Sequence, residues 1–192
     1  MLHKSSNVGA VKIGLELGPE GVYNGYQRFG IGEPLYSGFP GESTGVFRFW
    51  MDWGQIGTAT ASYGYGLSLS ALHLVRAYAA LANGGLMPHM RLTSAEAPVP
   101  PQRAVSRDAA DRVRRMLAGV VSIDGTGLRA AVQGYTVAGK TGTVRKIGES
   151  GYEANRHQSL FIGMLPAEQP RLVGLVMIDE PRSGAYYGGE VA

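Results

Sequence analysis

The sequence predicts an α+β fold, in which a run of helices is followed by an antiparallel sheet. Apolar residues recur at helical spacing through the N-terminal and middle parts of the chain, between clear helix start and stop signals. Runs rich in β-branched and apolar residues then follow at positions 134–146, 158–165 and 171–179. We expect a polar turn at 147–156 and a short loop at 166–170 between these runs. Strands that are joined in this way pair in sequence.

Two helices are predicted near the N-terminus from their end signals. Residues 5–7, Ser-Ser-Asn, are good N-cap residues, and Gly18 fits a C-terminal stop. Pro19 suits the first position of a second helix, which Gly30 can end. The apolar positions of the two helices are Val8, Val11, Leu15, Val22, Tyr26 and Phe29. The simplest interpretation of residues 5–7 is therefore a helix cap.

A long loop is predicted at residues 31–57, which are rich in Gly and Pro and contain both tryptophans. Within it, residues 41–45 match G-x-S-x-G, the pattern of the hydrolase nucleophile elbow. An elbow needs a strand before Ser43 and a helix after it. Phe39 and Pro40 precede the motif and an aromatic run follows it, so we prefer an ordered loop packed by aromatic side chains.

Two more helices are predicted in the middle of the chain. Ser70 begins the first, and residues 83–85, Asn-Gly-Gly, end it. Residues 86–101 carry four prolines and are expected to form a surface connection. Ser106 caps the second helix, which has the clearest amphipathic pattern of the chain, and residues 124–127 interrupt that pattern.

Composition excludes several classes of function. The chain has 192 residues, enough for one domain with a real core, and a net charge of +3 from 18 basic and 15 acidic residues. That balance does not favour nucleic acid as a partner. Because there is no cysteine, disulfides and thiol catalysis are excluded. The four histidines lack metal-ligand spacing, so we predict neither a metal nor a cofactor, and no segment resembles a signal peptide or membrane span.

The strand predicted at 134–146 has an unusual centre, in which Lys140 is followed by Thr141, Gly142 and Thr143. Glycine inside a strand costs stability and often marks a place where a ligand or another backbone approaches closely. A cation, two hydroxyl groups and room beside the backbone suit a substrate carboxylate that lies along the strand. Taken alone, the same residues also fit an ordinary strand with an exposed lysine.

The Lys-Thr-Gly triplet also occurs in penicillin-binding proteins and serine β-lactamases. In their order and spacing, the landmarks of this chain resemble the C-terminal half of a penicillin-binding protein transpeptidase domain. They most resemble the class B, division-type D,D-transpeptidases, the penicillin-binding protein 3 group. The resemblance spans nearly the whole chain and is carried by residues 5–9, 29–32, 39–43, 63–67, 125–127, 137–143 and 186–189. It implies a penicillin-binding-protein/serine β-lactamase-like transpeptidase fold.

The resemblance also implies a reaction. The family acylates an active-site serine with the D-Ala-D-Ala end of a stem peptide and passes the acyl group to a neighbouring amine. By resemblance, Ser5 would join the network of hydroxyl and lysine groups that moves protons. Asn7 would hydrogen-bond the amide backbone of the substrate, and Lys140 would tune the network and help to attract the terminal carboxylate. Ser5, Asn7 and Lys140 are thus the expected catalytic residues.

Thr141, Gly142 and Thr143 are the expected substrate-binding residues. By resemblance, the two threonines would bind the terminal carboxylate, and the backbone N–H of Thr143 would be one of two oxyanion-hole donors. The implied partners are the stem peptide, β-lactams, the rest of the same transpeptidase domain and cell-division assembly proteins. The implied location is the periplasmic side of the inner membrane, through an anchoring segment that this sequence lacks.

The chain departs from the family pattern in two places. Ser6 stands where the S-D-N motif has Asp, a position that commonly varies in the division group. No serine is followed three residues later by lysine, so the S-x-x-K motif is absent. Thr143 and Lys146 have a similar spacing, but they lie on the predicted strand, whereas the family has its pair at the start of a helix. We therefore expect residues 1–192 to be a single partial domain, which begins after the nucleophile and ends before the closing helix. Such a chain is expected to be marginally stable and inactive alone.

Other classes of protein fit parts of this pattern. A serine β-lactamase or a β-lactam sensor domain would share the Lys-Thr-Gly triplet. A non-catalytic peptidoglycan-binding protein would also lack S-x-x-K. The long loop rich in glycine and aromatic residues, together with residues 186–189, Tyr-Tyr-Gly-Gly, favours the transpeptidase.

Overall fold

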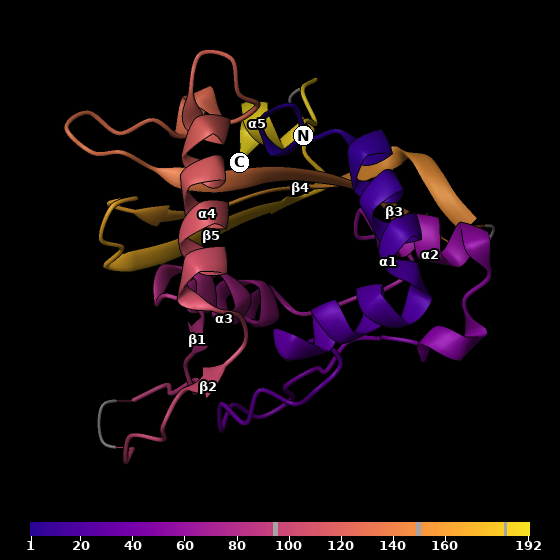
Figure 1. The fold of residues 1–192 in the computed structure, drawn as a ribbon. Coiled ribbons are helices and arrows are strands. Elements are labelled where there is room, and N and C mark those ends of the chain that lie inside the picture. Colours follow the sequence, from indigo (N-terminus) through magenta and orange to yellow (C-terminus); the bar gives the residue numbers. More distant parts are fainter. Residues whose placement is uncertain (94–95, 149–150, 183) are drawn as a thin grey trace. The chain divides into compact units, whose positions relative to one another are not determined.

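The computed structural model describes residues 1–93, 96–148, 151–182 and 184–192 (Figure 1). The chain divides into two compact units. The first unit contains Met1 and residues 6–110, and the second contains residues 2–5 and 111–192. Helix α4 (Arg107–Ala118) belongs partly to each unit. Among the described helices, none is long and apolar enough to cross a membrane.

The first unit opens with α1 (Asn7–Arg28), and the predicted cap is confirmed. Ser6 is the N-cap residue, and its Oγ accepts a hydrogen bond from the Gly9 backbone N–H at 3.2 Å. Gly18 leaves the helical conformation, with φ of 74° and ψ of 168°, and the next residue is Pro19. Figure 1 shows the change of direction in α1. The prediction of two helices that meet at Gly18 is therefore confirmed.

The predicted loop is largely confirmed, with a short 3-10 helix η2 (Trp50–Asp52) inside it. Its aromatic residues pack on α1, as in the stacked pair of Tyr23 and Phe47, whose ring centroids are 4.7 Å apart. The prediction is wrong at its end, because α2 (Gln55–Ala61) begins before Gly57. Helix α2 packs against α1 and buries Thr58 and Ala61 there, a tertiary contact that local composition does not reveal.

The rest of the first unit is helix α3 (Ala71–Ala82) and a small two-stranded sheet. After α3 the chain turns through two glycines with positive φ, at positions 84 and 85. Strand β1 (Leu86–Met87) then pairs with β2 (Gln102–Arg103), and Met87 is buried, so the prediction of a surface connection at 86–101 is wrong at its start. Met87 is buried against Ala80, which accounts for the pairing, and residues 94–95 of that connection lie outside the described residues.

The second unit is built on a three-stranded antiparallel sheet in the order β3-β4-β5 (Figure 1). The strands are β3 (Ala138–Gly148), β4 (Gly151–Leu165) and β5 (Leu172–Asp179). This order confirms the predicted sheet. Its core includes Ala138, Ile162 and Met164, which are all but fully buried.

The predicted ends of the first strand are wrong. Residues 134–137 precede β3: Gly134 lies in a turn closed by a bridge between Val132 and Tyr135, and residues 136–137 belong to no strand. At the other end, most of the predicted polar turn at 147–156 is strand, because β3 and β4 continue to Gly148 and Gly151. Backbone pairing needs no apolar side chains where a hairpin is exposed, so the polar composition was misleading. Residues 149–150 lie outside the described residues.

The second unit also contains several helical segments, of which η3 (Gly119–Val121) and α5 (Gly188–Val191) contact the sheet. Helix α4 begins as predicted, because the Ser106 Oγ accepts a hydrogen bond from the Ala109 N–H at 3.2 Å. It continues into the 3-10 helix η3 (Gly119–Val121), which packs against β3. The remaining elements of the unit are η1 (Leu2–Lys4), η4 (Leu128–Ala130) and α5 (Gly188–Val191). Together with β3, they form the surroundings of the candidate site.

Candidate active site

The second unit brings Lys140 and Ser5 together, although they are 135 residues apart in sequence. The Lys140 Nζ donates to the Ser5 Oγ at 2.7 Å and to the carbonyl oxygen of Thr141 at 3.0 Å. Lys140 lies within β3, opposite Ile162 of β4, so the sheet fixes its backbone. A primary amine and a hydroxyl at this distance can exchange a proton.

Ser5 is held by the N-terminal segment of the same unit. It follows η1, and its N–H donates to the Leu2 carbonyl oxygen at 3.1 Å. Its φ of 50° lies in the left-handed region, which is uncommon for a residue with a side chain. Helix η1 packs against η3, where a Cβ on Gly119 would overlap the ring of His3. The close approach at Gly119 therefore helps to place the Ser5 hydroxyl beside β3.

The surroundings of Lys140 lower its pKa. The side chain is half-buried, and desolvation by burial lowers the pKa of Lys140 below its ordinary value of 10.5. Both of the oxygens that it contacts, on Ser5 and on Thr141, are uncharged. A lysine with a lowered pKa beside a hydroxyl is an arrangement that enzymes use for proton transfer.

Thr141 and Thr143 are two residues apart on β3 and so share one face of the sheet. Thr141 Oγ1 lies 2.8 Å from Thr126 Oγ1. Thr143 Oγ1 accepts a hydrogen bond from the Gly188 N–H at 3.0 Å. Both hydroxyl groups are therefore fixed by neighbouring segments of the second unit.

Gly142 was expected to leave room for a close approach, and the structure shows which group takes it. On one side, a Cβ on Gly142 would lie 3.0 Å from Cδ1 of Leu160 on β4. On the other side, Gly188 is packed so tightly that its own Cβ would overlap the carbonyl oxygens of Gly142 and Leu160. The backbone of α5 therefore approaches β3 at its glycine.

Asn7 is the first residue of α1 and belongs to the first unit, whereas Ser5 belongs to the second. The S-x-N motif thus crosses the boundary between the units, and its middle residue Ser6 caps α1. The structure brings Ser5, Lys140, Thr141, Gly142 and Thr143 together in one unit. The role of Asn7 stays a prediction.

Two neighbours of the candidate site had been assigned no role from the sequence. Thr126 lies in the Gly-Thr-Gly motif, and Tyr186 lies in the segment before α5. The ring of Tyr186 stacks on His157 of β4 with centroids 4.2 Å apart, and its carbonyl oxygen accepts a hydrogen bond from the Ser159 hydroxyl. The local signal of these close contacts in the sequence is glycine: Thr126 is flanked by two glycines, and two glycines follow the pair of tyrosines that begins with Tyr186.

Ser43 does not form a nucleophile elbow. The motif at 41–45 lies in the loop, with neither a strand directly before it nor a helix directly after it. The Ser43 Oγ accepts a hydrogen bond from the Gly45 N–H at 3.2 Å, which closes a local turn.

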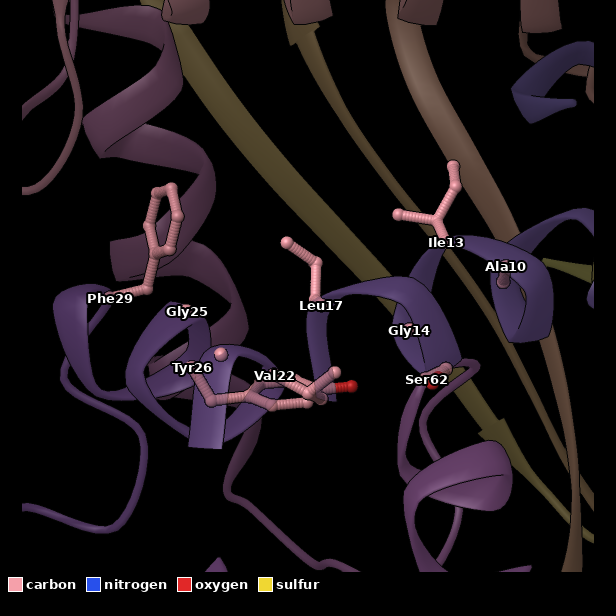
Figure 2. Close-up of a pocket in the computed structure, with 10 residues that line it drawn as sticks. Ala10, Ile13, Gly14, Leu17, Val22, Gly25, Tyr26, Phe29 and Ser62 are labelled. Atoms are coloured by element: carbon pink, nitrogen blue, oxygen red, sulfur yellow. The ribbon is translucent and has the colours of Figure 1, made fainter. Parts of the chain in front are cut away.

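A pocket of about 350 Å³ lies along α1 in the first unit (Figure 2). Most of its lining is apolar, and the polar side chains that line it are Tyr26 and Ser62. The Tyr26 hydroxyl donates to the Ala61 carbonyl oxygen, and the Ser62 hydroxyl donates to that of Thr58, both at 2.7 Å. Burial raises the pKa of Tyr26 to about 12. Because both hydroxyls are engaged with the backbone, this pocket is a poor candidate for catalysis.

Comparison with known proteins identifies the family. The penicillin binding protein transpeptidase domain matches residues 1–192. The chain is 43% identical over 193 residues to a probable peptidoglycan D,D-transpeptidase PenA of Neisseria flavescens, covering all of this chain and 48% of that protein. It is 37% identical over 192 residues to the peptidoglycan D,D-transpeptidase FtsI of Escherichia coli K12, covering 33% of that protein. The chain thus spans half or less of the length of these relatives.

Solved structures agree with the sequence relatives. The apo transpeptidase domain of Burkholderia pseudomallei penicillin-binding protein 3 superimposes with a TM-score of 0.91 at 43% identity, covering 99% of this chain and 58% of that one. Penicillin-binding protein 3 of Mycobacterium tuberculosis, complexed with aztreonam, gives a TM-score of 0.88 at 35% identity, covering 94% of this chain and 44% of that one. The predicted α+β transpeptidase fold is confirmed. The chain belongs to the penicillin-binding protein transpeptidase family.

Proposed function

We propose that this chain is part of a peptidoglycan D,D-transpeptidase that cross-links stem peptides during cell division. The observation that carries the proposal is the 2.7 Å contact between the Lys140 Nζ and the Ser5 Oγ, with the Thr141 and Thr143 hydroxyls on the same strand. The names of the relatives PenA and FtsI support the same reaction.

The proposed reaction has two steps. In the first, a serine hydroxyl attacks the carbonyl carbon between the two D-alanines, an ester forms, and the C–N bond to the terminal D-alanine breaks. The proton of the serine passes to the departing amine. In the second step, an amine of another stem peptide attacks the ester carbon, the C–O bond breaks, and the serine regains a proton. The lowered pKa of Lys140 and its contact with Ser5 suit the movement of these protons.

The remaining residues of the site would bind the substrate. We assign the terminal carboxylate to the hydroxyls of Thr141 and Thr143, with Gly142 between them allowing the close approach of α5 to the strand. The Thr143 N–H would donate to the developing oxyanion. Asn7 would hydrogen-bond the peptide backbone of the substrate.

The nucleophile of this proposal lies outside residues 1–192, because no serine in them is followed three residues later by lysine. Residues 1–192 would then be one part of the transpeptidase domain and would work with the rest of it. We also propose, from the family resemblance alone, cell-division proteins as partners. On the same basis we propose a position on the periplasmic side of the inner membrane.

Intact-mass spectrometry after incubation with a penicillin tests the proposal. The sample is the complete gene product that contains residues 1–192. We expect a stable adduct of one penicillin per chain, formed about 100-fold more slowly in Lys140→Ala, since proton transfer of this kind typically contributes 10²–10⁴ in rate. Ser43→Ala is the matched control and should react like the unmodified protein.

Three results would overturn the proposal. One is the absence of any adduct, and another is an adduct that maps to Ser43. The third is release of the drug within seconds, which would indicate a β-lactamase instead.

A further inference from the structure

The Gly-Thr-Gly motif at 125–127 is a turn that presents one side chain. The Gly125 N–H donates to the Ser122 carbonyl oxygen, and the Gly127 N–H donates to that of Val120, both at 2.9 Å. A Cβ on Gly125 would overlap the Val120 carbonyl oxygen. The Gly127 Cβ would lie 3.3 Å from the Phe161 ring, which is tighter than an ordinary contact. The two glycines therefore let the turn close, and only Thr126 contributes a side chain from it.

Thr126 is held from two directions within the second unit. Its Oγ1 lies 2.8 Å from Thr141 Oγ1, and both side chains are half-buried. Its carbonyl oxygen is covered by Gly189 of α5, where a Cβ would overlap it. A hydroxyl held between a tight turn and α5 has little freedom to leave its partner on β3.

The chemistry of a carboxylate decides the direction of this hydrogen bond. A hydroxyl has one proton to donate and two lone pairs to accept with, whereas an ionised carboxylate can only accept. When Thr141 donates its proton to a carboxylate, the proton between Thr141 and Thr126 must come from Thr126. The two hydroxyls then form a chain in which each bond polarises the next.

We propose that Thr126 is a positioning residue for the terminal carboxylate of the substrate and of β-lactams. Its hydroxyl donates to Thr141 and so directs the proton of Thr141 at the ligand. This inference rests on the proposed function, because it takes Thr141 as a carboxylate-binding residue. It adds that selectivity for a charged terminal carboxylate depends on a side chain outside the Lys-Thr-Gly triplet.

The test compares a penicillin with the methyl ester of its carboxylate. Acylation rates are measured by intact mass on the complete gene product, for the unmodified protein, Thr126→Val and Thr126→Ser. In Thr126→Val, we expect the acid to react about three- to ten-fold more slowly, the size of one net hydrogen bond. The ester should change less than two-fold, and Thr126→Ser should restore the preference for the acid. Ser122→Ala is the matched control, because the Ser122 hydroxyl donates to the Gly119 carbonyl oxygen of η3 rather than to Thr141.

Equal slowing of acid and ester in Thr126→Val would overturn the inference, because a merely structural role predicts it. Failure of Thr126→Ser to restore the preference, or the same loss of preference in Ser122→Ala, would overturn it as well. If the unmodified protein is not acylated at all, the proposed function falls and this inference falls with it. Normal acylation of Thr126→Val with unchanged selectivity would overturn only the inference.

Discussion

The two ends of β3 each carry a lysine with hydrogen-bonded partners, but the chemistry of the partners is opposite. Lys140 is half-buried and contacts the uncharged hydroxyl of Ser5. Lys146 contacts carboxylates, with its Nζ 2.9 Å from Asp179 Oδ2 and 2.8 Å from Glu180 Oε1. Burial lowers the pKa of Lys140, whereas hydrogen bonds to Asp179 and Glu180 raise the pKa of Lys146.

This difference separates the lysine that we propose for catalysis from one that is held in an ion-pair network. The charge of Lys146 is neutralised by partners that fasten the β3–β4 hairpin to the end of β5. The Ser5 hydroxyl and the Thr141 carbonyl oxygen, which Lys140 contacts, are uncharged and do not neutralise its charge in this way. Both lysines lie on β3, so the opposite shifts of their pKa values arise from their different surroundings.

Replacing each lysine by methionine should separate the two roles most strongly. In the complete gene product, Lys140→Met should slow acylation by a penicillin about 100-fold or more, because it removes a proton-transfer group. Its thermal stability should stay the same or rise, because a partly desolvated charge is removed. Lys146→Met should leave acylation within about two-fold but lower the melting temperature, because Asp179 and Glu180 lose the ammonium group that they share, although Arg156 still pairs with Glu180. Equal losses of activity in the two variants would contradict the comparison.

The approach of α5 to the site end of β3 can be tested with a pair of glycines. An added Cβ on Gly188 would overlap backbone oxygens of β3 and β4, whereas Gly174 on β5 faces open space. We expect Gly188→Ala to lower the free energy of unfolding by about 1–3 kcal/mol, the usual cost of overpacking. Acylation should slow about ten-fold as the Gly188 N–H leaves Thr143, a loss of about 1.4 kcal/mol.

Gly174→Ala serves as the control, since it should change stability by no more than about 0.5 kcal/mol. Urea denaturation and intact-mass acylation rates measure both variants. If Gly188→Ala behaved like Gly174→Ala in both assays, the tight packing of α5 on β3 would matter neither for stability nor for acylation.

The two lysines should also oppose each other in the pH dependence of stability. Because the pKa of Lys140 is lowered, the unfolded chain binds the proton more tightly. The contribution of Lys140 to the free energy of unfolding should therefore rise with pH until the pH reaches about 10.5, the ordinary pKa of lysine. Because the pKa of Lys146 is raised, its stabilising contribution is fully present below 10.5 and lost as pH rises through the folded value. Unfolding of the two methionine variants between pH 8 and 11 should give difference curves of opposite sign, and curves of the same sign would refute the assignment.

Sequence reasoning succeeded where the signal is local or repeats along the chain. The Ser6 cap, the break at Gly18 and the order of the three strands follow from caps, glycine geometry and β-branched runs. It failed where tertiary contacts decide the structure, as for α2, which is short and is held by its packing on α1. It also failed for the hairpin at 147–156, because exposed strands need no apolar pattern.

In the candidate site, too, the local sequence predicted which residues lie on one strand but not which distant residues contact them. The sequence placed a lysine and two hydroxyls on one strand, and the family resemblance supplied Ser5. Nothing local predicted that the Ser5 backbone would adopt positive φ beside Lys140, or that Thr126 would lie against Thr141. Contacts between residues far apart in sequence depend on the packing of whole elements, which periodicity does not encode.

The smallest effect is expected at the far end of β3, from Glu180→Gln. Glu180 receives hydrogen bonds from Lys146 and from Arg156, whose Nη2 lies 2.6 Å from the Glu180 Oε1. Those hydrogen bonds lower the pKa of Glu180 to about 2. A carboxylate with a lowered pKa contributes stability above its ordinary value of 4.5 and loses it as pH falls towards 2.

The network is exposed and shared among several charged groups, so water and salt should screen most of its strength. We expect Glu180→Gln to lower the melting temperature by about 1–2 °C at pH 7 and low salt, within the range of exposed ion pairs. The difference should disappear near pH 2 and in about 1 M salt, where screening extends over only a few ångströms. Acylation by a penicillin should not change, because within the described part of the chain no hydrogen bond or ion pair of the network reaches the proposed site residues. A large loss of acylation in this variant would mean that the two ends of β3 are coupled, and the separation of roles drawn from Lys140 and Lys146 would then fail.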